Sequence, residues 1–169
     1  PLISDPYLSG GGYHEIKRGG LLKIHADFNK HPKLDLDRRL NMIIYLNENW
    51  KDEWGGALQL FDQNMKTAIK TIYPRFNTAV IFSTTSFTFH GHPDPLNCPE
   101  DSSRRSLAYY YFSTGRPKNE VLKGTHGTLF KEREGEKFGK NVLLKNLLRD
   151  LIPPIFIKIK NRILKKITQ

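Results

Sequence analysis

The chain has 169 residues, a length that suits a single domain and allows a hydrophobic core without disulfides. Its 38% hydrophobic content, with 10 Phe, 7 Tyr and 2 Trp, excludes an intrinsically disordered protein. Cys98 is the only cysteine, which excludes an internal disulfide and a thiolate-rich zinc site. No apolar run reaches the roughly 18 residues of a membrane-spanning helix, and the first residues do not resemble a signal peptide, so we expect a cytoplasmic protein.

The positive charge is concentrated at one end of the chain. The formal net charge is +10, and from Lys140 onward eight Lys or Arg face one acid, Asp150, which makes +7. The rest of the chain is only mildly basic, so its charge gives no reason to expect a nucleic-acid partner.

Residues 12–115 have the pattern of short β-strands separated by turns. Alternating or β-branched runs are bounded by Gly, Pro and Asn, at a spacing that gives seven or eight strands. This pattern favours an all-β sandwich or barrel. The runs are HEIKRGGLLKIHADF (14–28), LNMIIYLN (40–47), GGALQLFD (55–62), NTAVIFSTTSFTFH (77–90) and RRSLAYYYFST (104–114).

The remainder of the chain divides into two parts. Residues 116–139 are polar and rich in glycine, which indicates an irregular connector. Residues 140–169 form a basic amphipathic helical tail, in which Leu and Ile recur at helical spacing and Pro153-Pro154 interrupts the pattern. Two arrangements fit this tail. Its apolar stripe lies on an anionic membrane surface, or it packs against the β-domain and leaves the lysines in solvent.

A candidate metal site begins at HADF, residues 25–28. Alternate side chains of an extended strand share a face, so His25 and Asp27 point to the same side. His90 and His92 also share a face of a later strand, and either one completes a set of two imidazoles and one carboxylate. Such a set leaves three coordination positions of Fe(II) open for substrate and oxygen, although Mn, Co or Ni also accept these ligands.

A second constellation follows on the strand at 104–114. Arg104 and Ser106 share a face, so a guanidinium and a hydroxyl together can bind the end of a dicarboxylate. On the other face Arg105 lies with Leu107 and Tyr109, an apolar set typical of packing. Arg104 is therefore our candidate, and Arg105 is the alternative.

Five segments in a fixed order resemble the Fe(II)- and 2-oxoglutarate-dependent dioxygenases, specifically their prolyl-4-hydroxylase-like branch. The resemblance covers residues 13–113. It implies a mainly β fold, with a double-stranded β-helix (jelly-roll) core in residues 1–115 and flanking helices that include the basic tail. The segments are GGLLKIHADFN, IIYLNENW, WGGALQLFD, PRFNTAVIFSTTSFTFHGHP and RRSLAYYYF.

This resemblance implies roles for the metal-ligating candidates. His25, Asp27 and His90 match the metal ligands of the family, and His92 is the alternative to His90. The family places the second histidine directly after the residue that closes the preceding strand, which favours His90. In addition, Pro93 holds His92 in an extended, loop-like conformation that suits the rim of the site.

The resemblance also implies a co-substrate site. Arg104 matches the residue that binds the far carboxylate of 2-oxoglutarate, with Tyr45 and Ser106 as further contacts. Many relatives carry a tyrosine upstream of the metal ligands, whereas this chain has Ile16 there, and Tyr13 lies three residues early. We therefore expect the contacts on that side of the co-substrate to differ.

The implied activity is hydroxylation coupled to oxidative decarboxylation of 2-oxoglutarate to succinate and CO2, with Fe(II) and O2 and with ascorbate as a candidate accessory reductant. Asp27 favours hydroxylation, because halogenating relatives replace this ligand with a small residue. A prolyl or other amino-acid or peptide substrate is expected. Candidate rim residues are Arg39, Asn41, Trp54, His92 and Asp94.

A non-enzymatic protein is the alternative. A cupin-like β-barrel shares the His-x-Asp pattern, and its basic tail would contact an anionic membrane or nucleic acid. Such a protein does not need the Arg-x-Ser strand after the second histidine, and its binding would depend steeply on salt.

Overall fold

The computed structural model describes residues 1–120 and 124–130. The chain divides into two units, Pro1–Lys131 and Glu132–Gln169, and the predicted basic tail lies outside the described residues. The elements are β1 (Ile3–Ser4), β2 (Gly12–Lys17), β3 (Leu22–Ala26), β4 (Asp37–Tyr45), η1 (Asp52–Trp54), β5 (Leu58–Phe61), β6 (Ala68–Ile72), β7 (Thr78–Ser83), β8 (Phe89–His92), β9 (Ser103–Ser113), η2 (Lys118–Glu120) and β10 (Leu129–Phe130).

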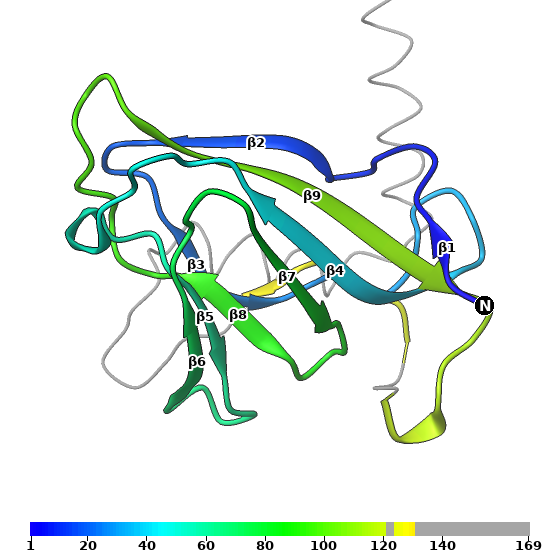
Figure 1. The fold of residues 1–169 in the computed structure, drawn as a ribbon. Helices are drawn as coiled ribbons and strands as arrows, with labels where there is room; N and C mark the ends of the chain where they lie inside the picture. The colour runs from blue at the N-terminus through cyan, green and yellow to red at the C-terminus, as the bar shows by residue number, and fades with distance from the viewer. Residues whose placement is uncertain (121–123, 131–169) are drawn as a thin grey trace, which may run out of the picture. The chain divides into compact units, whose positions relative to one another are not determined.

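Two five-stranded antiparallel sheets make up the first unit (Figure 1). The first sheet has the order β1-β9-β4-β7, and β2 also pairs with β9. The second has the order β10-β3-β8-β5-β6. The predicted mainly β, jelly-roll fold is confirmed. Within the described residues the helices are the two short 3₁₀ turns, η1 and η2.

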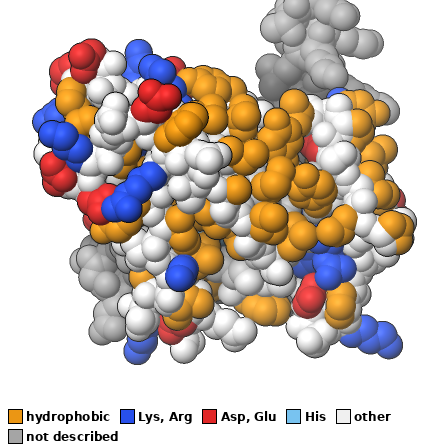
Figure 2. All heavy atoms as spheres, in the orientation of Figure 1, with side chains coloured by type: hydrophobic (Ala, Val, Ile, Leu, Met, Phe, Trp, Pro, Cys, Tyr) orange, Lys and Arg blue, Asp and Glu red, His pale blue; other side chains and the backbone are white. Residues whose placement is uncertain are grey.

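The period of two along β4 and β9 separates a polar inner face from an apolar outer face. On β9 the side chains of Arg104 and Ser106 are buried, whereas that of Arg105 is exposed. On the outer face, Tyr109 pairs with Met42 of β4, which in turn pairs with the exposed Ile81 of β7. Figure 2 shows hydrophobic side chains gathered on this side of the molecule.

The second sheet carries hydrophobic support on one face and polar side chains on the other. Ile24 and Ala26 alternate with His25 along β3, and Phe89 precedes His90 on β8. These three apolar residues form a buried cluster with Phe61 and Met65. The histidines therefore project toward the space between the sheets from a rigid, well-packed strand pair.

Two β-bulges change which side chains face inward. The pairing of β4 with β9 shifts between Arg38 and Leu40, so Arg39 is an extra residue in β4. An extra residue reverses the alternation of faces, and as a result the side chain of Arg38 is buried while that of Arg39 is only half-buried. A second shift lies between Leu22 and His25 on β3.

Residues expected to form a connector contribute to the β-domain. Among the described residues between 116 and 130, η2 covers Lys118–Glu120, and β10 pairs with β3 and places Phe130 opposite His25. Among the described residues, none of the helices has the length and hydrophobicity needed to cross a membrane.

Candidate metal centre

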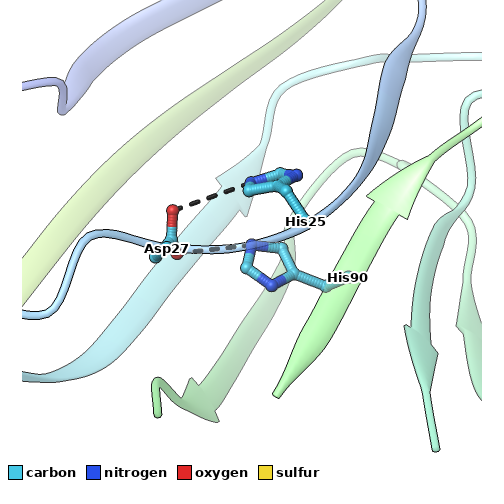
Figure 3. A group of neighbouring side chains, drawn as sticks. All are labelled: His25, Asp27 and His90. Carbon is cyan, nitrogen blue, oxygen red and sulfur yellow. Dashed lines mark ion pairs between the residues drawn. The ribbon is translucent and has the colours of Figure 1, made fainter. Parts of the chain in front are cut away.

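His25, Asp27 and His90 lie together between the two sheets (Figure 3). His25 Nε2 is 3.6 Å from Asp27 Oδ1, and His90 Nε2 is 3.3 Å from Asp27 Oδ2. One ligand atom from each residue lies within 4.8 Å of the others, and all three side chains are buried. In the part of the chain that the structure describes, this is the one group of three such side chains.

Both imidazoles are oriented to present Nε2 to a cation. His25 Nδ1 donates a hydrogen bond to the backbone oxygen of Lys23 at 2.8 Å, so Nε2 is the ring nitrogen that faces Asp27 and is available to a metal ion. Burial lowers the pKa of His90 despite the opposing effect of Asp27, so the His90 ring is neutral at pH 7. Two imidazoles and one carboxylate suit a divalent first-row metal ion.

Aromatic rings shield the imidazoles from solvent. Phe130 of β10 lies 5.3 Å from the ring of His25, and Phe82 of β7 lies 4.8 Å from the ring of His90, measured between centroids. The two imidazole rings are themselves 4.5 Å apart. Both imidazoles are therefore held by packing, and His25 is held by its hydrogen bond to Lys23 as well.

Asp27 is held in its ionised form by its surroundings. Burial by itself would raise the pKa of Asp27, but the adjacent His25 and His90, together with the charge of Arg38, hold this pKa well below its usual range. Asn41 Nδ2 also donates to Asp27 Oδ2 at 2.7 Å. The carboxylate is thus negative and oriented before any metal binds.

Arg38 is a buried cation that the sequence analysis did not identify. Its Nη2 lies 3.2 Å from Asp27 Oδ2, and its guanidinium donates twice to Asn41 Oδ1. The guanidinium carbon lies 3.5 Å from the centroid of the Tyr110 ring and 4.2 Å from that of Phe28. The bulge in β4 turns Arg38 inward. In the sequence, only its closeness to Asn41 could have pointed to it.

Arg104, which the sequence pairs with Ser106 as a second constellation, lies on the inner face of the first sheet. Its Nε donates to the backbone oxygen of Gly56 at 2.7 Å, and its Nη2 donates to the Tyr45 hydroxyl at 3.2 Å. Burial raises the pKa of Tyr45, so its hydroxyl keeps a proton to donate. Ser106 is buried on the same face. Arg105 instead points outward, 3.5 Å from Glu15.

Gly56 explains how Arg104 approaches the backbone so closely. A Cβ at this position would lie 2.9 Å from Arg104 Cδ and 2.5 Å from Leu96 Cδ2. Its φ of +72° also lies in the left-handed region that favours glycine. The Gly-Gly sequence before β5 therefore creates the space that the guanidinium occupies.

The candidate rim residues differ in location from one another. Arg39 is half-buried and lies 3.4 Å from Glu120, and Trp54 packs edge-on against Trp50. Asp94 is exposed. Two others are not rim residues in the structure, because Asn41 is buried against Asp27 and His92 is only 2% exposed.

The 2OG-Fe(II) oxygenase superfamily matches residues 11–112, and the chain belongs to this superfamily. The cofactor and co-substrates of the family are Fe(II), 2-oxoglutarate and O2. Membership does not favour the alternative of a non-enzymatic binding module.

Individual relatives carry hydroxylase names. The chain is 29% identical over 108 residues to "Prolyl 3-hydroxylase OGFOD1" of Mus musculus, a match that covers 55% of this chain and 19% of that protein. It therefore spans about a fifth of the length of this curated relative.

The solved structures that match part of the chain include prolyl hydroxylases. A Pseudomonas putida prolyl-4-hydroxylase is 21% identical, with a TM-score of 0.46 over 62% of this chain and 52% of that chain. A Trichoplax adhaerens prolyl hydroxylase, solved in complex with a peptide fragment of hypoxia inducible factor, is 22% identical, with a TM-score of 0.46 over 59% of this chain and 41% of that chain.

Loss of the Asn41 hydrogen bond is expected to weaken metal binding. Asn41→Leu keeps a similar volume but removes the donor that orients Asp27, and we expect an affinity for Mn(II) that is about 10–100-fold lower. Calorimetric titration measures this affinity, with Asn97→Leu, at an exposed position, as the control. Equal affinities in the two variants would show that Asn41 does not orient the carboxylate.

The stability of the metal-free protein is expected to depend on pH through His92. Burial, with smaller effects from Arg104 and His25, lowers the pKa of His92 to about 3. Between pH 6.5 and pH 3 the unfolded chain binds the proton and the folded chain does not, so stability is lost as the pH falls.

From pH 7 to pH 5 this difference removes roughly 2 kcal/mol of unfolding free energy. Urea unfolding at the two pH values measures the loss, and His92→Leu is expected to reduce the pH dependence by that amount. An identical pH dependence in the wild type and the variant would contradict the assignment.

Proposed function

We propose that the chain contains the catalytic domain of a 2-oxoglutarate-dependent hydroxylase, and that its substrate is a prolyl residue or another amino-acid residue of a peptide. The observation that carries this proposal is the His25, Asp27 and His90 cluster between two sheets, with Arg104 on the inner face of the opposite sheet. His25, Asp27 and His90 would hold Fe(II). When bound, the metal supplies the activation of O2 and the chelation of a 2-oxo acid.

Arg104 is assigned to the far carboxylate of 2-oxoglutarate. Its guanidinium is buried and already held by Gly56 and Tyr45, so little side-chain freedom is lost when a carboxylate binds. Tyr45 can donate its own hydroxyl proton to the same carboxylate, and Ser106 lies on the same face. A charged clamp of this kind selects a dicarboxylate over a simple 2-oxo acid.

The residues around the metal-ligating atoms are assigned to orientation and to the exclusion of water. Asn41 and Arg38 fix the carboxylate of Asp27, and Phe82 and Phe130 cover the imidazoles. Asp27 would occupy a coordination position of the metal, so no place would be left there for a halide ion. Hydroxylation is therefore the proposed outcome, and the name of the mouse relative supports a prolyl substrate.

The proposal is tested by anaerobic addition of Fe(II) and 2-oxoglutarate to the purified protein. We expect the weak visible charge-transfer band of the ternary complex, and we expect His25→Ala to abolish it. Arg104→Met should require about 10–100-fold more 2-oxoglutarate to develop the band, because a charge-assisted hydrogen-bonded pair is lost.

Arg105→Met is the matched control, since the neighbouring guanidinium is exposed on the outer face of the same strand. It should bind 2-oxoglutarate like the wild type. Absence of the band in the intact protein, or equal behaviour of Arg104→Met and Arg105→Met, would contradict the proposal. Formation of succinate in air then reports turnover, and candidate prolyl peptides can be compared by the rate at which they stimulate it.

A further inference from the structure

His92 is a buried polar side chain that the proposed roles leave unused. It is the last residue of β8, it is 2% exposed, and neither Nδ1 nor Nε2 has a hydrogen-bond partner among the described residues. Buried polar atoms in folded proteins are almost always paired, so an imidazole without a partner at either nitrogen points to a missing ligand.

His92 is close enough to both constellations of the site to interact with their charged groups. His92 and His90 share a face of β8, and two residues of a strand span roughly 6.5 Å. The residues whose electrostatic effects reach His92 are Arg104 and His25, one from each constellation. The distance from His90 to His92 along the strand is comparable to the length of a five-carbon dicarboxylate.

The hydrogen bonds that Arg104 already makes leave room for a second side chain to donate to the far carboxylate. Its Nε is committed to the backbone of Gly56 and its Nη2 to Tyr45, so part of the guanidinium is already occupied. A carboxylate has about four acceptor positions. Arg104 and Tyr45 approach from the first sheet, whereas His92 approaches from the second.

We propose that His92 binds the far carboxylate of 2-oxoglutarate together with Arg104, by donating an imidazole N–H hydrogen bond from the opposite sheet. This inference rests on the proposed function. The carboxylate then links the two sheets, and Arg104 supplies the charge while His92 supplies a neutral donor. His92 is a co-substrate-binding residue and not a metal ligand, since the cluster of ligand atoms contains His90 and not His92.

The test compares two ligands in the Mn(II)-loaded protein without oxygen. 2-Oxopentanoate has the same chelating end and carbon number as 2-oxoglutarate but no far carboxylate. Calorimetric titration measures the affinity of each ligand and of Mn(II) itself in the wild type, His92→Leu, His92→Asn and His92→Gln. Thr71→Leu, at an exposed position on β6 of the same sheet as His92, is the control.

We expect His92→Leu to bind 2-oxoglutarate about 10–100-fold more weakly, the effect of losing a hydrogen bond to a charged group. Its affinities for 2-oxopentanoate and Mn(II) should stay at the wild-type values. The amide of Asn or Gln can replace one ring nitrogen as a donor, so at least one of these variants should recover part of the affinity. Thr71→Leu should match the wild type.

Several results would overturn the inference. If His92→Leu binds 2-oxoglutarate with unchanged affinity, or binds both ligands equally more weakly, His92 does not contact the far carboxylate. A loss of Mn(II) affinity would show that His92 is a metal ligand. If His92→Leu does not fold, as judged by circular dichroism, the variants His92→Asn and His92→Gln provide the test. Equal weakening of both ligands in these variants would also overturn the inference. Failure of the wild type to bind 2-oxoglutarate would instead overturn the proposed function as well.

Discussion

The ionised carboxylate of Asp27, buried between two sheets, is the constraint around which the site is organised. A buried carboxylate is costly unless it is paired and hydrogen-bonded. Here Asn41 donates to it, Arg38 lies 3.2 Å away and two imidazoles flank it. These contacts outweigh the effect of burial and keep the pKa low, so the site carries a negative charge ready for a cation.

The division of labour between the sheets follows from this constraint. The second sheet supplies His25 from β3, Asp27 directly after β3 and His90 from β8, and an apolar cluster supports them on the opposite face. The first sheet supplies Asn41 and Arg38, which orient the carboxylate, and Arg104, which is assigned to the co-substrate. Both rows of side chains are held on strands, whose geometry is more exact than that of loops.

Period-two alternation made much of this arrangement predictable. It placed His25 with Asp27, His90 with His92, and Arg104 with Ser106, and the structure has all three pairs buried. The choice between Arg104 and Arg105 also followed from alternation, since the two guanidiniums lie on opposite faces of β9.

Other features were not accessible from the sequence. The bulge at Arg39 reverses the faces of β4, so a strict alternation could not place Arg38 beside Asp27. Phe130 covers His25 through a strand pairing between segments about 100 residues apart, in a stretch that reads as a connector. His92 was expected at the rim because Pro93 follows it, yet the strand continues through His92 and buries its ring.

The central claim is that His25, Asp27 and His90 bind one metal ion whose 2-oxo acid ligand reaches Arg104. An anaerobic crystal structure of the protein with Mn(II) and 2-oxoglutarate tests it most directly. The account predicts metal density bonded to Nε2 of both histidines and to Asp27, with the co-substrate chelated to it and the far carboxylate at Arg104. Metal bound by any other set of side chains, or 2-oxoglutarate oriented away from Arg104, would contradict it.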